Sequence, residues 1–372
     1  MKILIMSNCP LERNQGSGYV ICGFADGLRQ RGHSVKAFGP DDVILFPSLQ
    51  AARRLRLFLG YTLKAITVGW DRNCRYDIIE LWGGLGWCAC LVLTRWRRRP
   101  YLVISRSNGL EPHFRQMCDQ LQDGWTPKRL LSRLQNFTDT LGFRYADALT
   151  VVSRYDYEYS MRQCYQSYGG LVKIDNPLPE DWLNQTLPKA KEDCVFGFVG
   201  SWIDRKGAEQ LIKIINSLKA KGSQAGWIVA GVGASGKDVL LKNTSLKPGE
   251  VYEHTDRMHL KQLYRKMTAL LCLSSYESFG MVCTEAMACG CMLLSTDVGF
   301  ASSLKDGEEY IRIDRDNTDT IADILLETER DGSKYRNLIE KGYARVQRLE
   351  WTAAVDTLEE VYRGLLSQVP LQ

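Results

Sequence analysis

The chain has 372 residues, of which 45% are hydrophobic and 24% are charged, as in ordinary globular proteins. One hydrophobic core rarely serves a chain of this length, so two domains are expected. No run of 18 or more apolar residues occurs, which argues against a membrane-spanning helix. The opening MKILIMSNCP is too short in its apolar part for a signal peptide and is expected to form a first strand.

The net charge of +5 is unevenly distributed along the chain. Residues 1–180 carry 24 Lys and Arg against 16 Asp and Glu, whereas residues 181–372 carry 24 against 27. Two arginine clusters with interleaved Leu, Phe and Trp account for much of the excess: Arg53, Arg54, Arg56, Arg95, Arg97, Arg98 and Arg99. Such clusters either attract anionic lipid or phosphate, or form a solvated basic face, and the sequence leaves both open.

The twelve cysteines contain no C-x-x-C pair. Cys88 and Cys90, and Cys289 and Cys291, are the only close pairs, and both pairs lie in apolar runs. We therefore expect buried thiols in a reducing cytoplasm, with zinc binding or disulfides as the alternative.

Short apolar runs alternate with helical patterns along the whole chain. The expected strands are 2–6, 34–38, 77–81, 101–105 and 148–152 in the first half, and 194–200, 226–231, 250–254, 269–273 and 291–295 in the second. Helical patterns fall between them, for instance at 16–31, 128–146, 206–221 and 257–268. Continuously apolar strands that alternate with helices are typical of parallel sheets covered on both faces.

The stretch 175–193 is polar, contains three prolines and separates the two series of strands, so it is the expected linker. Two Rossmann-like domains that face each other across a cleft are therefore predicted. The helical patterns from 316 to 367 have no further strands to connect. We expect them to pack back over the edge of the cleft.

Glycines follow the first strand at Gly16 and Gly18, where a residue without a Cβ lets a ligand approach the backbone. Their spacing is not G-x-G-x-x-G, which counts against a dinucleotide site there. That motif does occur at Gly231, Gly233 and Gly236. Because no strong helix or ribose-binding strand is predicted after it, we interpret it as a tight turn rather than an NAD site.

The stretch FGFVGSWIDRKGAEQLI (196–212) places Arg205 and Lys206 at the start of a helical pattern. Cations there oppose the helix dipole unless an anion is bound. A departing diphosphate would supply that anion; a solvated pair of cations is the alternative.

The stretch SSYESFGMVCTEAMACG (274–290) contains two glutamates, Glu277 and Glu285, separated by seven residues. The loop that carries Glu277 follows a predicted strand, and open α/β sheets bind ligands at the carboxyl ends of strands. The helix that follows offers free backbone N–H groups to a diphosphate. One carboxylate would then accept hydrogen bonds from a sugar ring and the other from a ribose, unless both are unrelated surface residues.

Together these stretches resemble the retaining GT-B glycosyltransferases of the group 1 (family 4) type. FVGSWIDRKG, IVAGVG, YESFGMVCTEAMACG and STDVGF are similar to the donor domain of such enzymes, and NQGSG, SRSNGLE and ADALTVVSRYD to the acceptor domain. The resemblance implies an α/β protein of the GT-B fold. Its expected parts are an acceptor domain at 1–178, a donor domain at 179–352 and a terminal helix at 353–372 that packs back towards the first domain.

The resemblance also implies roles for particular residues. Glu277 would bind the hydroxyls of a donor hexose and Glu285 the ribose, while Arg205 and Lys206 would neutralise the departing diphosphate. Catalytic roles thus fall to Glu277, Lys206 and Arg205. The expected donor-binding residues are Gly16, Gly18, Asn108, Ser278, Phe279, Gly280, Met281 and Glu285.

Three positions depart from the pattern of the family. Ser201 stands where many relatives have arginine, Asn108 where relatives often have histidine, and Phe300 where a second glycine is common. Asparagine can bind a sugar hydroxyl but cannot act as a general base. Nearby, His113 is either structural or part of the site, and Glu111 is a candidate for contact with the acceptor.

The resulting hypothesis is a cytoplasmic, retaining transferase that moves a hexose from a nucleoside diphosphate sugar to a hydroxyl acceptor without a metal ion or other cofactor. The expected acceptor is a glycan or lipid-linked glycan of the cell envelope. The basic first domain would contact an anionic membrane, and no nucleic acid is expected as a partner. A sugar-nucleotide epimerase and a non-catalytic donor-binding protein are the alternatives.

Overall fold

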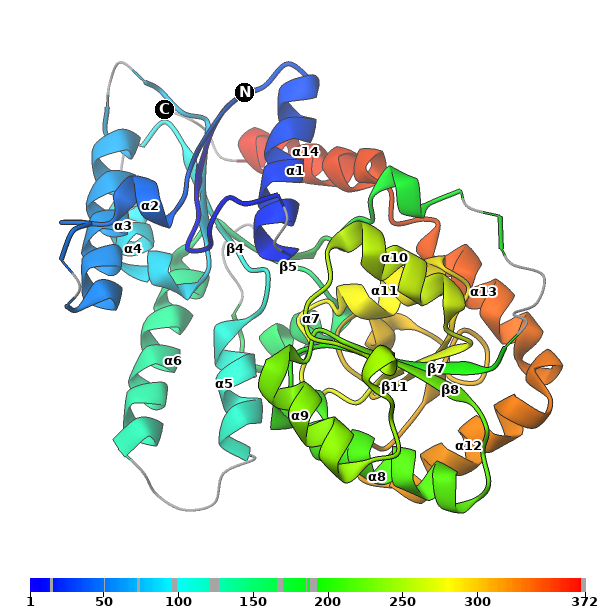
Figure 1. The fold of residues 1–372 in the computed structure, drawn as a ribbon. Helices are drawn as coiled ribbons and strands as arrows, with labels where there is room; N and C mark the ends of the chain where they lie inside the picture. Colours follow the sequence, from blue (N-terminus) through cyan, green and yellow to red (C-terminus); the bar gives the residue numbers. More distant parts are fainter. Residues whose placement is uncertain are drawn as a thin grey trace. The chain divides into compact units, whose positions relative to one another are not determined.

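The computed structural model describes residues 1–13, 16–49, 51–71, 74–95, 99–120, 127–165, 170–184, 186–187 and 193–368. The chain forms two compact units (Figure 1). Unit 1 comprises Met1–Pro177 together with Trp351–Gln372, and unit 2 comprises Leu178–Glu350. The predicted boundaries differ from these by no more than two residues.

Unit 1 is a parallel six-stranded sheet with the strand order β2-β1-β3-β4-β5-β6. Its four central strands, β1, β3, β4 and β5, are almost entirely buried, as expected for a sheet with helices on both faces, whereas the edge strands β2 and β6 are not. Its strands and α-helices are β1 (Lys2–Met6), α1 (Gly16–Gln30), β2 (Ser34–Phe38), α2 (Pro40–Val43), α3 (Arg53–Gly69), β3 (Ile78–Trp82), α4 (Trp87–Thr94), β4 (Leu102–Arg106), α5 (Glu111–Gln120), α6 (Pro127–Tyr145), β5 (Ala148–Val151), α7 (Arg154–Arg162), β6 (Leu171–Lys173) and α14 (Trp351–Gln368).

Unit 2 is a second parallel six-stranded sheet, with the order β12-β11-β10-β7-β8-β9. Phe196, Phe198 and Leu271 lie in its core. Its strands and α-helices are β7 (Val195–Val199), α8 (Ala208–Ala220), β8 (Gly226–Ala230), α9 (Gly233–Asn243), β9 (Val251–Tyr252), α10 (Arg257–Lys266), β10 (Ala269–Cys272), α11 (Met281–Ala288), β11 (Met292–Ser295), β12 (Ile311–Arg312), α12 (Thr318–Arg330) and α13 (Arg336–Val346).

Each sheet has one point at which the strand order reverses direction. In unit 1 the point lies between β1 and β3, and in unit 2 between β7 and β10. Connections on the two sides of such a point leave towards opposite faces, which opens a crevice at the carboxyl ends of the two strands. Ligand-binding residues are therefore expected directly after these four strands.

Helix α14 returns to unit 1 because two glycines of α1 make room for it. A Cβ on Gly23 would lie 2.0 Å from the Trp351 ring, and one on Gly27 would lie 2.6 Å from Val355. The Trp351 indole packs edge-on against Tyr19 and Phe24 and donates a hydrogen bond to the Tyr19 hydroxyl over 2.8 Å. The helix thus completes the apolar core on this face of unit 1.

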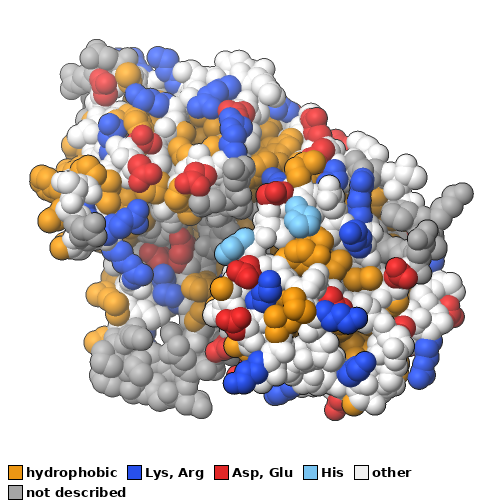
Figure 2. Space-filling model, viewed as in Figure 1, with side chains coloured by type: hydrophobic (Ala, Val, Ile, Leu, Met, Phe, Trp, Pro, Cys, Tyr) orange, Lys and Arg blue, Asp and Glu red, His pale blue; other side chains and the backbone are white. Residues whose placement is uncertain are grey.

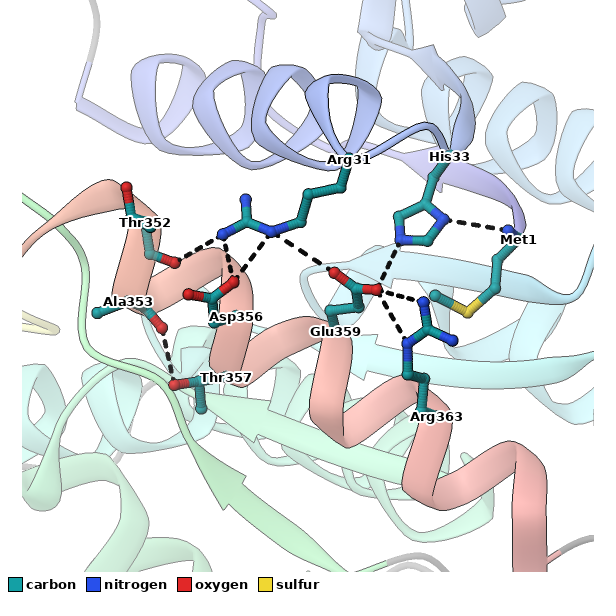
Figure 3. A network of polar contacts seen from close by, with 9 residues as sticks. All are labelled: Met1, Arg31, His33, Thr352, Ala353, Asp356, Thr357, Glu359 and Arg363. Carbon is teal, nitrogen blue, oxygen red and sulfur yellow. Dashed lines mark hydrogen bonds and ion pairs between the residues drawn. The ribbon is translucent and has the colours of Figure 1, made fainter.

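Polar contacts fix the same helix along its length (Figure 3). Arg31, just after α1, donates to Asp356 over 3.0 Å and lies 3.5 Å from Glu359. Glu359 also contacts His33 over 3.3 Å and accepts from Arg363 over 2.9 Å. The C-terminal segment is therefore held by charge as well as by apolar packing.

All ten predicted strands are present, but three sequence interpretations are wrong. The short strands β6 and β12 are not predicted, and helix α9 begins at Gly233, within the G-x-G-x-x-G stretch where no strong helix is expected. The predicted linker is part of unit 2 from Leu178 onwards: Trp182 is 1% exposed and packs edge-on against Tyr264. Prolines and charges in this stretch conceal its buried apolar side chains.

The helical patterns beyond residue 316 form α12, α13 and α14. The first two remain in unit 2, where α12 packs on α8 and α13 on α11. None of the helices in the described part of the chain has the length and hydrophobicity needed to cross a bilayer.

Candidate functional site

The switch point of unit 2 brings Lys206 next to Glu277. Lys206 ends a short 3₁₀ turn (Asp204–Lys206) after β7, and Gly207 follows it in the left-handed region with a φ of 85°. A Cβ on Gly207 would lie 2.4 Å from the Leu273 Cβ, beyond the end of β10. Only glycine therefore lets this turn lie against the neighbouring strand and carry Lys206 to the loop after it.

The Glu277 carboxylate is fixed by two donors. Its Oε1 atom accepts from the Lys206 ammonium over 2.5 Å and from the Ser274 hydroxyl over 2.6 Å. Thr296, after β11, donates to the Ser274 carbonyl over 2.6 Å and so ties the loop to the next strand. The result is a pre-positioned pair of opposite charges at the carboxyl ends of β7 and β10.

Arg205 braces the loop that carries Glu277. Its guanidinium donates to the Tyr276 carbonyl over 2.7 Å, and its own carbonyl accepts from the Ser275 N–H over 2.8 Å. The structure thus places both predicted cations at this loop. Lys206 contacts the carboxylate directly, and Arg205 contacts the backbone of the loop.

Helix α11 begins at the next residues of the same loop. Gly280, its N-cap, has a φ of 81°, which a side chain would disfavour. Phe279 is buried against Phe300, with ring centroids 5.4 Å apart, while Ser278 and Met281 are half-buried. Phe300, where the family often has glycine, is therefore buried behind Phe279.

Glu285 lies one turn inside α11 and is almost completely enclosed. Its carboxylate accepts a long 3.4 Å hydrogen bond from Tyr264 and lies 3.7 Å from the Arg257 guanidinium. Burial raises the pKa of Glu285 to about 7, against the smaller opposing effects of Arg257 and Tyr264. With Glu277 9% and Glu285 7% exposed, neither glutamate is a solvated surface residue, so that alternative is wrong.

In unit 1 the predicted glycines differ in their surroundings. Gly16 is exposed at the start of α1, with no atom within 4 Å of a Cβ placed on it. A Cβ on Gly18 would lie 2.4 Å from the Glu12 carbonyl oxygen, so Gly18 is required for packing of its own loop. Asn108 reaches this segment and donates to the Ser17 carbonyl over 3.4 Å, while its Oδ1 atom is buried without a hydrogen-bond partner.

The switch point of unit 1 carries a cluster of polar side chains packed closely around Gly83 and Gly84. Glu111 accepts from the Gly84 N–H over 2.8 Å, and its other oxygen, Oε2, is buried without a partner. A Cβ on Gly83 would lie 1.9 Å from the Asn8 amide, and one on Gly84 would lie 2.3 Å from the Asp139 carboxylate. Burial first, and then the charge of Asp139, raise the pKa of Glu111 to about 7.

Motifs do not predict Asn8 or Asp139. The available signal for Asn8 is its place two residues after β1, at the switch point. Asp139 gives no comparable signal, since it belongs to helix α6 and its ion pair with Arg115 joins two helices.

The family model for "Glycosyl transferases group 1" matches residues 181–345. Unit 2 therefore matches the group 1 glycosyl transferase model over nearly its whole length. The matched segment contains Lys206, Glu277 and Glu285, and hence the charge pair and the buried carboxyl described above. The curated relatives that the chain resembles are also named as glycosyltransferases.

Two of those relatives illustrate the extent of the similarity. A D-inositol 3-phosphate glycosyltransferase of Thermomonospora curvata is 36% identical over 107 residues, 28% of this chain and 25% of the relative. An uncharacterized glycosyltransferase of Methanocaldococcus jannaschii, MJ1178, is 26% identical over 188 residues, 49% of this chain and 52% of the relative. The matches thus span from a quarter to about half of these relatives.

Solved structures extend the likeness of fold to nearly the whole chain. Sucrose-phosphate synthase from Thermosynechococcus elongatus superimposes with a TM-score of 0.76 at 20% identity, covering 99% of this chain and 100% of that one. Anabaena Alr3699/HepE, in complex with UDP and glucose, gives 0.69 at 15% identity, covering 98% and 100%. The two parallel sheets with their helices therefore have the GT-B fold.

His113, the other candidate near the predicted acceptor residues, is held by contacts within unit 1. His113 is buried, contacts Asp156 over 2.8 Å and stacks on Tyr159 with ring centroids 4.0 Å apart. These contacts favour the structural interpretation. Of the closely spaced cysteines, Cys90, Cys289 and Cys291 are buried and Cys88 is half-buried. In the described part of the chain, no three His, Cys, Asp or Glu side chains are placed to hold a metal ion.

The arginine clusters are only partly a solvated face. Arg56 is buried and donates to the carbonyls of Leu45, Phe46 and Ala51. Arg99 pairs with Asp147 through both of its terminal nitrogens. Arg53, Arg54 and Arg95 are exposed, and Arg97 and Arg98 lie outside the described residues.

Proposed function

We propose that the protein is a retaining glycosyltransferase that moves a hexose from a nucleoside diphosphate sugar to a hydroxyl group. The observation that carries the proposal is the Lys206–Glu277 pair at the switch point of unit 2, followed at once by the start of α11 and the buried Glu285. A cation, backbone donors and two carboxylates in that order suit a diphosphate flanked by a sugar and a ribose.

Each residue has a separate task in this proposal. Glu277 accepts hydrogen bonds from the hexose and Glu285 from the ribose, while the N–H groups around Ser278–Met281 receive the diphosphate. As the bond between the anomeric carbon and the diphosphate oxygen breaks, Lys206 stabilises the charge that develops on the leaving group. Arg205 keeps the loop in place and adds positive charge.

The acceptor hydroxyl attacks the face of the sugar that the leaving group vacates. Its oxygen bonds to the anomeric carbon, and its proton passes to an oxygen of the departing diphosphate. This chemistry retains the anomeric configuration and needs no metal ion or other cofactor. Asn108 contributes a hydrogen bond to the donor but no base, because an amide does not titrate.

The polar cluster at Gly83 and Gly84 supports a place for the acceptor. The unpartnered Oε2 of Glu111 and the amide of Asn8 lie where β1 and β3 end, and suit the hydroxyls of a sugar. We further propose a glycan or lipid-linked glycan of the cell envelope as the acceptor. The enzyme would then work on the cytoplasmic side, at the membrane surface.

A thermal-shift screen with UDP-, GDP-, ADP- and dTDP-glucose tests the donor. A ligand that binds only the folded state raises the melting temperature by mass action, so one nucleotide should stand out. That donor should be hydrolysed slowly, in EDTA as well as without it, and Glu277→Ala should abolish the hydrolysis. Binding without any turnover would indicate a donor-binding protein instead, and an isomerised nucleotide sugar seen by NMR would indicate an epimerase.

A further inference from the structure

Helix α3 exposes an apolar ridge. Leu55, Leu59 and Leu63 recur every fourth residue, so they lie on one face of the helix, and their exposed fractions are 56%, 42% and 53%. In the segment before the helix, Phe46 is 71% exposed and Leu49 52%. Five large apolar side chains within 18 residues of chain thus face solvent.

Helix α6 continues this surface on the same side of unit 1. Leu130, Leu131, Leu134 and Phe137 are each more than half exposed. Helices α3 and α6 both pack against α4, so the three form one layer over the sheet. Figure 2 shows hydrophobic side chains at the outer border of unit 1 where Figure 1 labels α3 and α6, with Lys and Arg and some acidic side chains among them. We call these nine apolar residues the outer face: Phe46, Leu49, Leu55, Leu59, Leu63, Leu130, Leu131, Leu134 and Phe137.

Exposed apolar residues are concentrated in one unit. Of the sixteen large apolar side chains exposed in the described part of the chain, thirteen belong to unit 1, and unit 2 has only Ile203, Val239 and Met258. Single exposed apolar residues need no explanation, but a contiguous set marks a binding surface.

The charge of the outer face restricts its partner. Helix α3 contains no acidic residue, and α6 contains one, Asp139, which is buried and paired with Arg115. Exposed arginines flank the leucines: Arg53 and Arg54 at the start of α3, and Arg133 between the leucines of α6. Leucines edged by arginines match a bilayer with anionic headgroups, and the two exposed aspartates nearby lie on the short helix α2, which packs on α3.

We infer that the outer face docks unit 1 on an anionic phospholipid bilayer, with the leucines among the upper acyl chains and the arginines among the headgroups. The apolar ridge supplies most of the attraction, because Arg56 and Arg99 of the sequence clusters are engaged within the protein. The purpose of this contact rests on the proposed function, because a lipid-linked acceptor is confined to the membrane surface.

Flotation of the full chain with vesicles tests the contact. The wild type should float with phosphatidylcholine vesicles that contain phosphatidylglycerol, and less with phosphatidylcholine alone. Leu55→Ser/Leu59→Ser/Leu63→Ser should lower the partition coefficient by about tenfold or more, because three apolar side chains leave the interface. The matched control Val239→Ser/Met258→Ser changes exposed apolar residues of unit 2 and should float like the wild type.

Two further measurements keep the inference falsifiable. Thermal unfolding, and donor hydrolysis measured without vesicles, should be unchanged in the triple variant, which separates loss of docking from loss of folding or of the proposed catalysis. Absence of flotation by the wild type, or equal flotation of the triple variant, would refute the contact. A wild-type dimer that the triple substitution converts to a monomer, with no vesicle binding, would instead assign the outer face to a second copy of the chain.

Discussion

Lys206 is the residue for which the geometry makes the sharpest kinetic prediction. Its ammonium is held by Glu277 beside the start of α11, so the positive charge is in place before the leaving group departs. Lys206→Met should lower kcat by about 10²-fold, the size typical of one electrostatic contribution. Lys213→Met, at an exposed position of α8, is the matched control in steady-state assays, and equal rates for the two variants would remove Lys206 from the mechanism.

Glu285 makes a prediction about stability and pH. Its pKa is about 7 in the folded protein and near 4.5 in the unfolded chain, so the folded state binds more protons between these values. Stability therefore falls as pH rises through this window. Glu285→Gln removes the effect, and its melting temperature relative to wild type should be higher at pH 8 than at pH 4.5.

The exposed Glu350 gives the control for this comparison. Glu350→Gln should show no such change between the two pH values. If Glu285→Gln also shows no change in relative melting temperature between the two pH values, the interpretation of Glu285 as a buried carboxyl is wrong.

Glu111 separates acceptor binding from donor chemistry. If its free oxygen receives an acceptor hydroxyl, Glu111→Gln should raise the KM for acceptor about tenfold, the loss expected for a hydrogen bond to a charged group. Donor hydrolysis should not change. The control Glu158→Gln changes an exposed residue of α7 and should alter neither the KM for acceptor nor donor hydrolysis. If Glu111→Gln lowers donor hydrolysis as much as it weakens acceptor binding, Glu111 lies at the donor instead.

Sequence spacing identifies only part of this residue-level picture. Glu277, Glu285 and Lys206 are predictable because each lies beside a strand end or helix start that the apolar pattern already locates. Asp139 is not, since its proximity to Gly84 depends on how α6 crosses the sheet, 55 residues further along the chain.

At the level of elements, the α1–α14 contact depends on two missing side chains. Gly23→Ala would place a methyl group where the Trp351 ring lies, and overpacking of this kind costs about 1–3 kcal/mol. The melting temperature of unit 1 should fall accordingly. Gly364→Ala, on α14 with nothing near its Cβ, should instead stabilise the helix by about 0.5–1 kcal/mol.

The contrast between the two glycines is the test in thermal unfolding. If Gly23→Ala lowers the melting temperature no more than Gly364→Ala does, then the Trp351 ring does not fill the space beside Gly23. Both substitutions add the same methyl group to a helix, so intrinsic helix propensity cannot explain a difference in sign.

The elements that sequence reveals are those with long, regular apolar patterns. The ten predicted strands are continuously apolar over at least part of their length, whereas β6 and β12 have only three and two residues. Helix α9 starts with Gly233 and includes Gly236, which packs against Trp202 and weakens the helical signal. Leu178, Trp182 and Leu183 are buried by tertiary contacts that no local pattern shows.

At the scale of the whole molecule, the division into units is a matter of which segments share a core. Local composition places a break near Pro177 but cannot show that Trp351–Gln372 rejoins the first unit. Val355, Leu358 and Tyr362 are buried together with Ile5 and Phe24, and this contact joins the two ends of the chain.

This arrangement predicts opposite behaviour for two fragments. Residues 178–350 contain a complete sheet with its core, and all the proposed donor-binding residues that follow Asn108. This fragment should therefore unfold cooperatively, and it should bind the nucleotide found in the thermal-shift screen. Residues 1–177 lack α14 and leave its apolar groove on α1 open, so they should bind a hydrophobic dye and unfold without cooperativity. Joining residues 351–372 to that fragment through a Gly/Ser linker should restore cooperative unfolding, measured by circular dichroism. A first fragment that is equally cooperative with and without the helix would show that α14 is an accessory to unit 1 rather than part of its core.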